Sequence, residues 1–150
     1  MQLQAFMTTR VVSVEPDDTL AQVKEIFDNT RFHHLLVVEH NKLVGVLSDR
    51  DLLRHISPFV GGLHETTRDL CTLKRRAHQI MSHHPVTLPP EAEIEAAVDV
   101  FRRHSISCIP IVDTDMQPLG IISWRDLLTF VSDQDAVQAA QGRASLAVSH

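Results

Sequence analysis

The chain has 150 residues, 43% hydrophobic and 22% charged, which is typical of a globular protein long enough to bury a core. Its formal net charge of −5 argues against a nucleic-acid-binding protein, because such proteins present strongly basic surfaces. Cys71 and Cys108 give no disulfide framework, and the sequence has neither a signal-peptide pattern nor an apolar run near the roughly 20 residues of a membrane helix. These features predict a soluble, cytoplasmic protein.

The first part of the chain predicts a β-α-β-β-α unit. Residues 11–14 form a short β-rich run that Pro16 stops, and residues 19–29 carry apolar side chains at helical spacing. Residues 35–38 and 43–47 are rich in valine and leucine, which is typical of buried strands. A second helix is expected directly after Ser48.

A linker follows in which Gly61-Gly62 interrupts the chain, and residues 67–81 show a helical period of apolar side chains. The basic run at 74–76 is interpreted as a solvated face of that helix. The second part repeats the first, with strands predicted over 86–88, 109–112 and 119–122 and a helix over 93–104. The tail after Ser132 is rich in alanine and glutamine, and the sequence leaves open a frayed helix or disorder, with no assigned role.

An internal repeat explains this parallel. Shifting the chain by 74 residues places Met7 on Met81 and Phe27 on Phe101, and one extra loop residue after Asp113 raises the later offset to 75. Self-similarity at a fixed offset indicates one supersecondary unit used twice, with neither unit burying its apolar face well alone.

Two copies of a seven-residue motif stand at the end of the third strand of each unit. Gly45-Val46-Leu47-Ser48-Asp49-Arg50-Asp51 reappears as Gly120-Ile121-Ile122-Ser123-Trp124-Arg125-Asp126. A serine and an aspartate at this spacing form a good helix cap. The same helix start exposes N–H groups that can hold an anion, so the motif allows both interpretations.

The unit and its motif, present twice, resemble a tandem pair of CBS domains, known as a Bateman module. The resemblance covers about residues 7–132 and implies an α+β fold, in which two β-α-β-β-α repeats pack through their sheets about a pseudo-twofold axis. It places repeat 1 within residues 1–64, with a core at 7–56. The linker helix and repeat 2 then occupy residues 65–150, with a core at 81–132 and an uncertain tail at 133–150.

The resemblance also implies two related clefts that bind adenosine-containing ligands of the AMP, ADP or ATP class. Cleft one joins residues of the first motif to residues of the second unit: Ser48, Asp51, Met81, Val86, Ile106 and Ser107. Cleft two joins residues of the second motif to residues of the first unit: Ser123, Asp126, Met7, Val12, Phe32 and His33. The strand residues Val46 and Ile121, the first-turn Arg50 and Arg125, and His34 complete the expected ligand-binding set.

These residue types suit such a ligand. Gly45 and Gly120 lack a side chain where the backbone is expected to approach something bulky. The aspartates can accept hydrogen bonds from the two neighbouring hydroxyls of a ribose, and the serines, arginines and His33 or His34 can meet a phosphate.

Other interpretations of single residues are weaker. The pairs His33-His34 and His83-His84 are poor metal clamps, because adjacent side chains on a strand point to opposite faces. Cys108 stands at the entrance of an apolar strand and is interpreted as an inert thiol. Trp124, which replaces Asp49, can stack on a base but is better interpreted as a packing residue.

No paired nucleophile and base marks an enzyme, and no cofactor or metal is predicted. The sequence therefore predicts a regulatory module that senses an adenine nucleotide, forms a homodimer and signals to an unidentified protein target, without contact to nucleic acid or membrane. The alternative is a structural or protein-docking module in which one or both clefts stay empty.

Overall fold

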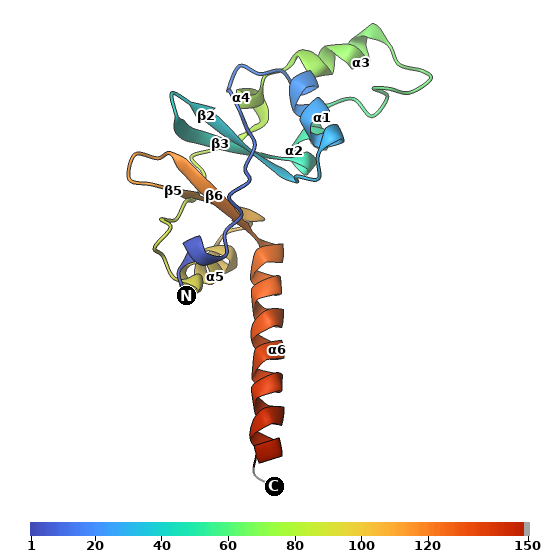
Figure 1. The fold of residues 1–150 in the computed structure, drawn as a ribbon. Coiled ribbons are helices and arrows are strands. Elements are labelled where there is room, and N and C mark those ends of the chain that lie inside the picture. Colours follow the sequence, from blue (N-terminus) through green and yellow to red (C-terminus); the bar gives the residue numbers. More distant parts are fainter. Residues whose placement is uncertain (149–150) are drawn as a thin grey trace.

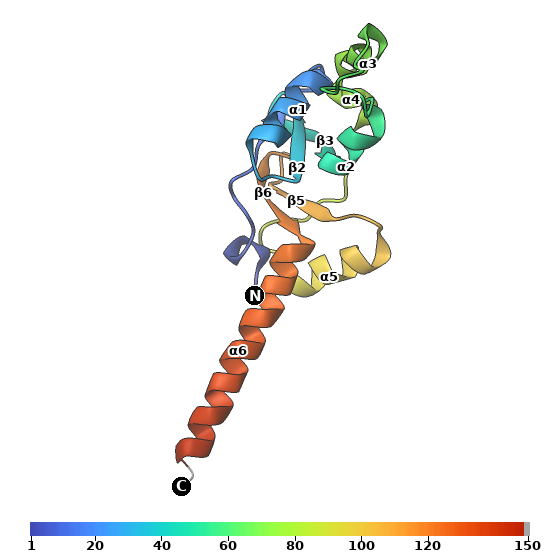
Figure 2. The ribbon, with the colours of Figure 1, turned by 90° about the vertical axis from the view of Figure 1, so that its right-hand side faces the viewer.

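The computed structural model describes residues 1–148, and the side chains of residues 1–143. Two globular units lie one above the other, and a long helix projects from the lower unit (Figures 1 and 2). The elements occur in the expected order, and the mixed α+β architecture of two repeats is confirmed.

Repeat 1 is built on one sheet. The strands are β1 (Ser13–Val14), β2 (His34–Glu39), β3 (Lys42–Ser48) and β4 (Ser82–His83), in spatial order 1-2-3-4. β1 runs parallel to β2, whereas the hairpin β2–β3 and the pair β3–β4 are antiparallel. Helices α1 (Leu20–Asn29) and α2 (Asp49–His55) pack their apolar residues against this sheet.

Repeat 2 has the same plan with a smaller sheet. The hairpin consists of β5 (Cys108–Val112) and β6 (Pro118–Ser123), with α5 (Ile94–Arg103) before it. The strand predicted over 86–88 is reduced to one parallel bridge between Leu88 and Ile111, at the place that β1 occupies in repeat 1. After β6 the chain enters α6 (Trp124–Val148), so residues 133–148 are helical.

The segments that lead into each repeat pack in the core of the other repeat. The 3-10 helix η1 (Leu3–Ala5) begins the chain, and the fully buried Leu3 packs with Ile94 and Phe101 of α5. Conversely, α4 (Ala77–Ile80) lies before repeat 2 in sequence, yet Ala77 and Ile80 pack in the core of repeat 1. The two repeats are therefore joined by exchanged segments as well as by their sheets.

A third apolar cluster lies where the sheets meet. Leu36, Val46, Cys108 and Val112 are buried together, with Ile121 packed against them. This cluster draws on both hairpins, and it fixes how the motif at the end of β3 faces the motif at the end of β6.

The continuous helix predicted over 67–81 is wrong. The segment is divided into α3 (Thr67–Cys71), η2 (Thr72–Lys74) and α4, and Arg75 and Arg76 between them have extended backbones. Tertiary hydrogen bonds hold this break, since the Arg75 carbonyl accepts from the Leu20 N–H at 2.8 Å. In addition, the Arg76 guanidinium donates to the Asp17 carbonyl at 2.7 Å. These contacts outweigh the local helical period.

Candidate functional site

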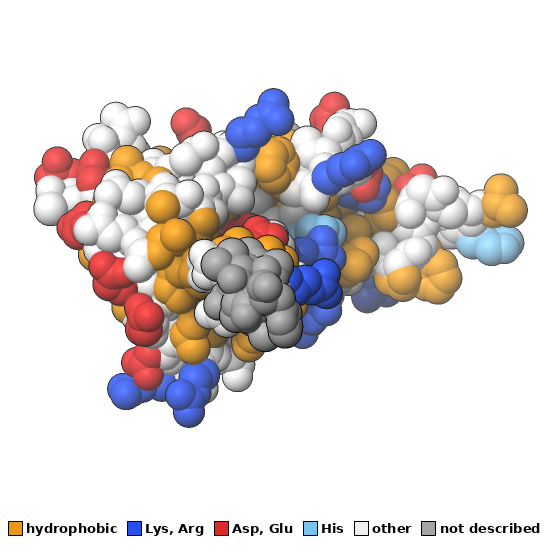
Figure 3. Space-filling view, turned by 60° about the horizontal axis from the view of Figure 1, so that its bottom comes forward, with side chains coloured by type: hydrophobic (Ala, Val, Ile, Leu, Met, Phe, Trp, Pro, Cys, Tyr) orange, Lys and Arg blue, Asp and Glu red, His pale blue; other side chains and the backbone are white. Residues whose placement is uncertain are grey.

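One cleft of about 1250 Å³ takes in both motifs. Its walls come from the ends of β2 and β3, the first turn of α2, the end of α5, and the corresponding parts of β5, β6 and α6. In Figure 3, arginine or lysine side chains and a histidine gather on the face shown, to the right of its centre. The cleft is continuous, so the two separate clefts expected from the sequence are one space in this structure.

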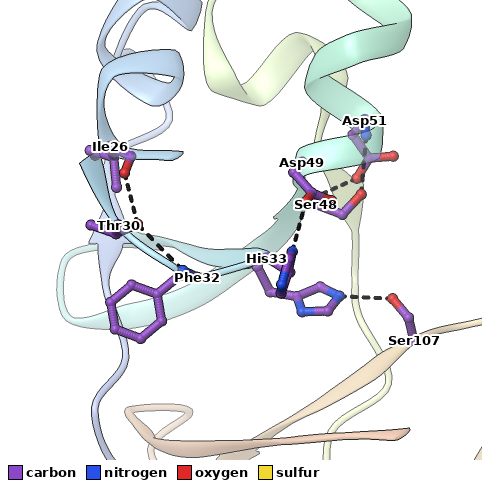
Figure 4. A network of polar contacts seen from close by, with 9 residues as sticks. Ile26, Thr30, Phe32, His33, Ser48, Asp49, Asp51 and Ser107 are labelled. Atoms are coloured by element: carbon purple, nitrogen blue, oxygen red, sulfur yellow. Dashed lines mark hydrogen bonds and ion pairs between the residues drawn. The ribbon is translucent and has the colours of Figure 1, made fainter. Parts of the chain in front are cut away.

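The end of the cleft formed by repeat 1 (the repeat-1 end) is organised by the cap of α2. Ser48 Oγ accepts from the Asp51 N–H at 3.1 Å, and Asp51 Oδ2 accepts from the Ser48 N–H at 2.9 Å. Next to this cap, His33 Nδ1 lies 2.8 Å from Asp49 Oδ2, and the Asp49 N–H donates to the His33 carbonyl at 3.0 Å (Figure 4). Asp51 lines the cleft, and its Oδ1 accepts no hydrogen bond from the described residues.

The end formed by repeat 2 (the repeat-2 end) has the same backbone geometry. Asp126 Oδ2 accepts from the Ser123 N–H at 2.8 Å, and Ser123 Oγ accepts from the Asp126 N–H at 3.4 Å. The Trp124 N–H donates to the Ser107 carbonyl at 3.3 Å, which matches the bond between Asp49 and His33. The indole of Trp124 donates to the Ile106 carbonyl at 3.1 Å, and its ring lies 5.2 Å from that of Phe101. Trp124 therefore packs on Phe101, and it also lines the cleft with 48% of its surface exposed.

One hydrogen bond spans the two repeats inside the cleft. His34 Nε2 lies 2.8 Å from Ser107 Oγ, between β2 and the residue just before β5 (Figure 4). Burial lowers the pKa of the His34 imidazole, although the nearby carboxylate of Asp49 opposes this shift. At neutral pH the His34 ring is therefore uncharged, and it links the repeats as a neutral hydrogen-bonding group.

The cleft is much more basic than the protein as a whole. It is lined by seven arginines and three aspartates, which gives a net charge of +4 when its histidines are neutral, whereas the whole chain carries −5. Five of these arginines were not predicted from the sequence: Arg10, Arg31, Arg54, Arg102 and Arg103. A partial signal exists, since Arg54 stands four residues after Arg50 on the same helix face and Arg31 directly precedes Phe32.

The structure places all but three of the predicted ligand-binding residues in this cleft. The lining includes Val46, Ser48, Arg50, Asp51, Val86, Ile106, Ser107, Ile121, Ser123, Arg125, Asp126, Phe32, His33 and His34. Met7, Val12 and Met81 do not line it and instead pack against the hydrophobic cores. His33, expected beside Asp126, makes its side-chain contact with Asp49 of its own repeat.

The two motif glycines face these methionines. A Cβ added at Gly45 would lie within 2.8 Å of two atoms of the Met81 side chain and 3.0 Å from the Ser82 carbonyl oxygen. At Gly120 it would lie 2.8 Å from both Met7 Sδ and the Thr8 carbonyl oxygen. The bulky group that each glycine accommodates is thus a methionine of an exchanged segment, Met81 at Gly45 and Met7 at Gly120.

Cys108 is buried, and burial raises the pKa of its thiol to about 12, as expected for an unreactive cysteine. Across the part of the chain that the structure describes, no group of three or more histidine, cysteine, aspartate or glutamate side chains is placed to hold a metal ion. None of the described helices, α6 included, combines the length and apolar character that crossing a bilayer requires.

Two equivalent β-α-β-β-α units that exchange their leading segments, and that share one cleft with a capped helix start at each end, define a tandem-repeat module. The chain belongs to the CBS domain family, whose family pattern matches residues 3–58 and 77–133.

Comparisons with individual proteins agree with this family. The CBS domain of a membrane protein from Sphaerobacter thermophilus is 30% identical with a TM-score of 0.73, over 86% of each chain. CBSX2, an Arabidopsis thaliana CBS-pair protein, was solved in complex with AMP. It shares the fold with a TM-score of 0.72 at 23% identity, over 89% of this chain and 98% of that chain.

Among curated proteins, inosine-5'-monophosphate dehydrogenase of Methanocaldococcus jannaschii is 26% identical over 138 residues, which is 91% of this chain and 25% of the dehydrogenase. The chain spans about half or less of the length of the first curated relatives that it matches. Because the match covers only 25% of the dehydrogenase, it gives no reason to assign the dehydrogenase activity to this chain.

Proposed function

We propose that this protein is a non-catalytic regulatory module that binds adenosine-containing ligands in the cleft between its repeats and passes the signal to a partner protein. The observation that carries the proposal is the charge of the cleft. Seven arginines face three aspartates in a chain of net charge −5, which is the arrangement that an anionic ligand requires.

The polar groups around that charge fit a nucleotide. Asp51 and Asp126 each have an oxygen free of hydrogen bonds from the described residues, and a carboxylate can accept both hydroxyls of a ribose. Val46 and Ile121 offer apolar surface on which a purine can lie. Arg50 and Arg125, one residue before the aspartates, are close enough in sequence to neutralise the phosphate of the same ligand.

A related protein supports the ligand class. CBSX2 was solved with AMP, and this chain matches it over most of both lengths. AMP, ADP and ATP share the adenosine that Asp51 and Asp126 would recognise, and they differ in the phosphates that the arginines would neutralise.

A second candidate is a structural or docking module whose cleft stays empty. It is favoured by the capping boxes, because Ser48 with Asp51 and Ser123 with Asp126 already satisfy the first backbone N–H groups of α2 and α6. The motif would then need no ligand to explain it.

Thermal unfolding with adenosine, AMP and ATP separates the two candidates. A ligand at 100 times its dissociation constant stabilises the folded state by about 2.7 kcal/mol, which raises the melting temperature measurably. The double variant Asp51→Asn/Asp126→Asn is the control, because it reduces the acceptor strength at both ends while keeping side-chain size. If none of the three compounds shifts the unfolding of the unmodified protein, the docking function stands instead.

A further inference from the structure

We propose that Asp49 makes the two ends of the cleft unequal, so that the phosphate of an anionic adenosine ligand is accepted at the repeat-2 end and opposed at the repeat-1 end. The inference rests on the proposed function and assigns a specificity-determining role to a residue outside the set predicted to bind the ligand.

The two ends are equivalent in backbone. Each has a serine and an aspartate in a reciprocal cap. The residue directly after the serine donates its N–H to the carbonyl of the residue that precedes β2 in repeat 1 or β5 in repeat 2. Both repeats supply arginines to the cleft: Arg31, Arg50 and Arg54 belong to repeat 1, Arg102, Arg103 and Arg125 to repeat 2, and Arg10 to the segment whose Thr8 bridges to Ile121. Neither repeat lacks arginines, and the backbone geometry of the two caps does not distinguish the ends.

The side chain at one position does. At the repeat-1 end Asp49 adds a carboxylate directly after Ser48, and its Oδ2 lies 2.8 Å from His33 Nδ1. At the repeat-2 end the same position is Trp124, whose ring carries no charge and is held by Ile106 and Phe101. Only the repeat-1 end holds a second carboxylate in addition to its motif aspartate.

A phosphate next to Ser48 would stand within a few ångströms of this carboxylate, and the two negative charges would repel each other. Because the Asp49 side chain is 40% exposed, water screens part of this repulsion, so the expected effect is moderate. Asp49 also competes with the ligand for a hydrogen-bond donor, since it already occupies the imidazole of His33. Near Ser123 a phosphate meets neither obstacle. Adenosine, which has no phosphate, would meet no such repulsion at either end.

The test is calorimetric titration of AMP and of adenosine into the unmodified protein, Asp49→Asn and Asp115→Asn. Asn at position 49 removes the charge and keeps a side chain that can hydrogen bond to His33. Asp115 lies outside the cleft on an exposed turn, so Asp115→Asn makes the same change in net charge as a matched control.

We expect AMP to bind the unmodified protein at one strong and one weak site, and Asp49→Asn to tighten the weak site about tenfold. Asp115→Asn should leave both sites unchanged, and adenosine should bind all three proteins alike. Adding Asp51→Ala should abolish the gain, and adding Asp126→Ala should preserve it.

Three results would overturn the inference: equal AMP sites in the unmodified protein, equal effects of Asp49→Asn and Asp115→Asn, or a gain that Asp126→Ala removes. A gain for adenosine as large as that for AMP would do the same, because charge would then not be the cause. Failure of both AMP and adenosine to bind the unmodified protein would instead overturn the proposed function, and this inference with it.

Discussion

Gly45 and Gly120 lie at equivalent places in the two repeats, and each meets the methionine of a segment supplied by the other half of the chain. A few residues further on the likeness ends, because Asp49 is paired with His33 whereas Trp124 packs on Phe101. The repeats thus agree where they are fitted to each other and differ where they face the cleft. Positions that pack one repeat against the other are the same in both copies, whereas positions that line the cleft are free to differ in chemistry.

The largest effect is expected at the exposed leucines that follow the two motifs. Leu53 and Leu128 occupy equivalent positions and are 70% and 65% exposed, so the homodimer predicted from the sequence would bury both. The double variant Leu53→Glu/Leu128→Glu should abolish the dimer. Light scattering should then report the 16.9 kDa of one chain, in place of about 34 kDa for the unmodified protein.

The single variants sharpen this comparison of the repeats. If both leucines lie in one interface, each single change should weaken the dimer to a similar degree. The exposed Val137 further along α6 is the control position, and Val137→Glu should leave the dimer intact. An unmodified protein that is monomeric at micromolar concentration would contradict the prediction.

The next effect concerns the motif aspartates. Asp51→Ala and Asp126→Ala should each weaken AMP binding at one end of the cleft about ten- to hundredfold, because a hydrogen bond to a charged group contributes roughly 1.5–3 kcal/mol. Each change also removes a capping interaction, which costs the fold about 1 kcal/mol. Calorimetry measures the first effect and urea unfolding the second.

Comparing the two variants separates binding from capping. Ser48→Ala and Ser123→Ala disturb the same caps without removing a carboxylate, so they should lower stability and change affinity less. Asp51→Ala and Asp126→Ala proteins that both bind AMP like the unmodified protein would show that these aspartates are helix caps alone.

The glycine contacts give a smaller effect on stability. Gly45→Ala and Gly120→Ala should each reduce the free energy of unfolding by about 1–3 kcal/mol, because the added methyl group has no room. The loss should be larger at Gly120, where the Thr8 carbonyl oxygen would lie 2.8 Å away and belongs to a backbone bridge to Ile121. At Gly45 the tightest contacts are with the more adaptable Met81 side chain.

Urea unfolding of the two variants measures this difference, and Gly142→Ala is the control, because a Cβ at that exposed helical position meets nothing within 4 Å. Gly142→Ala should stabilise slightly, since alanine favours a helix over glycine. Equal losses of unfolding free energy at Gly45 and Gly120 would contradict this prediction, because the backbone at Gly120 would then adjust as readily as the Met81 side chain at Gly45.

The smallest effect is expected from pH. Because burial lowers the pKa of His34 in the folded protein, the unfolded chain takes up the proton first as the pH falls below the usual value of 6.5. Stability should therefore decline from about pH 6.5 downward until the folded His34 also titrates. His34→Gln should flatten this decline relative to the unmodified protein, as measured by urea midpoints between pH 7.5 and 5. An unchanged slope would assign the decline to the other histidines.

Sequence reasoning succeeded where the repeat constrains it. The strands after His33 and Ser107 and the helix caps at Ser48 and Ser123 follow from local pattern, and both copies agree. It failed over 67–81, where Arg75 and Arg76 are held extended by contacts with Leu20 and Asp17 that no local period reveals.

For the site, the sequence located the two motifs but not the space between them. Met7 and Met81 were expected at the ligand from the resemblance to CBS domains. The exchange of leading segments, a tertiary feature, instead places both side chains against Gly120 and Gly45. Arg102 and Arg103 were missed because the end of a helix carries no motif, and only the fold brings them opposite the first repeat.

The sequence contains two repeats, but because their leading segments are exchanged, dividing the chain between them does not give two complete folding units. A fragment ending near residue 64 would lack Ala77 and Ile80, which complete the first core, and a fragment starting there would lack Leu3, which completes the second. Produced as separate chains, the halves would each carry the piece that the other lacks. Each repeat therefore depends on a segment that precedes the other repeat in sequence. Recombination that replaces one repeat with that of a relative must also replace the segment that completes its core.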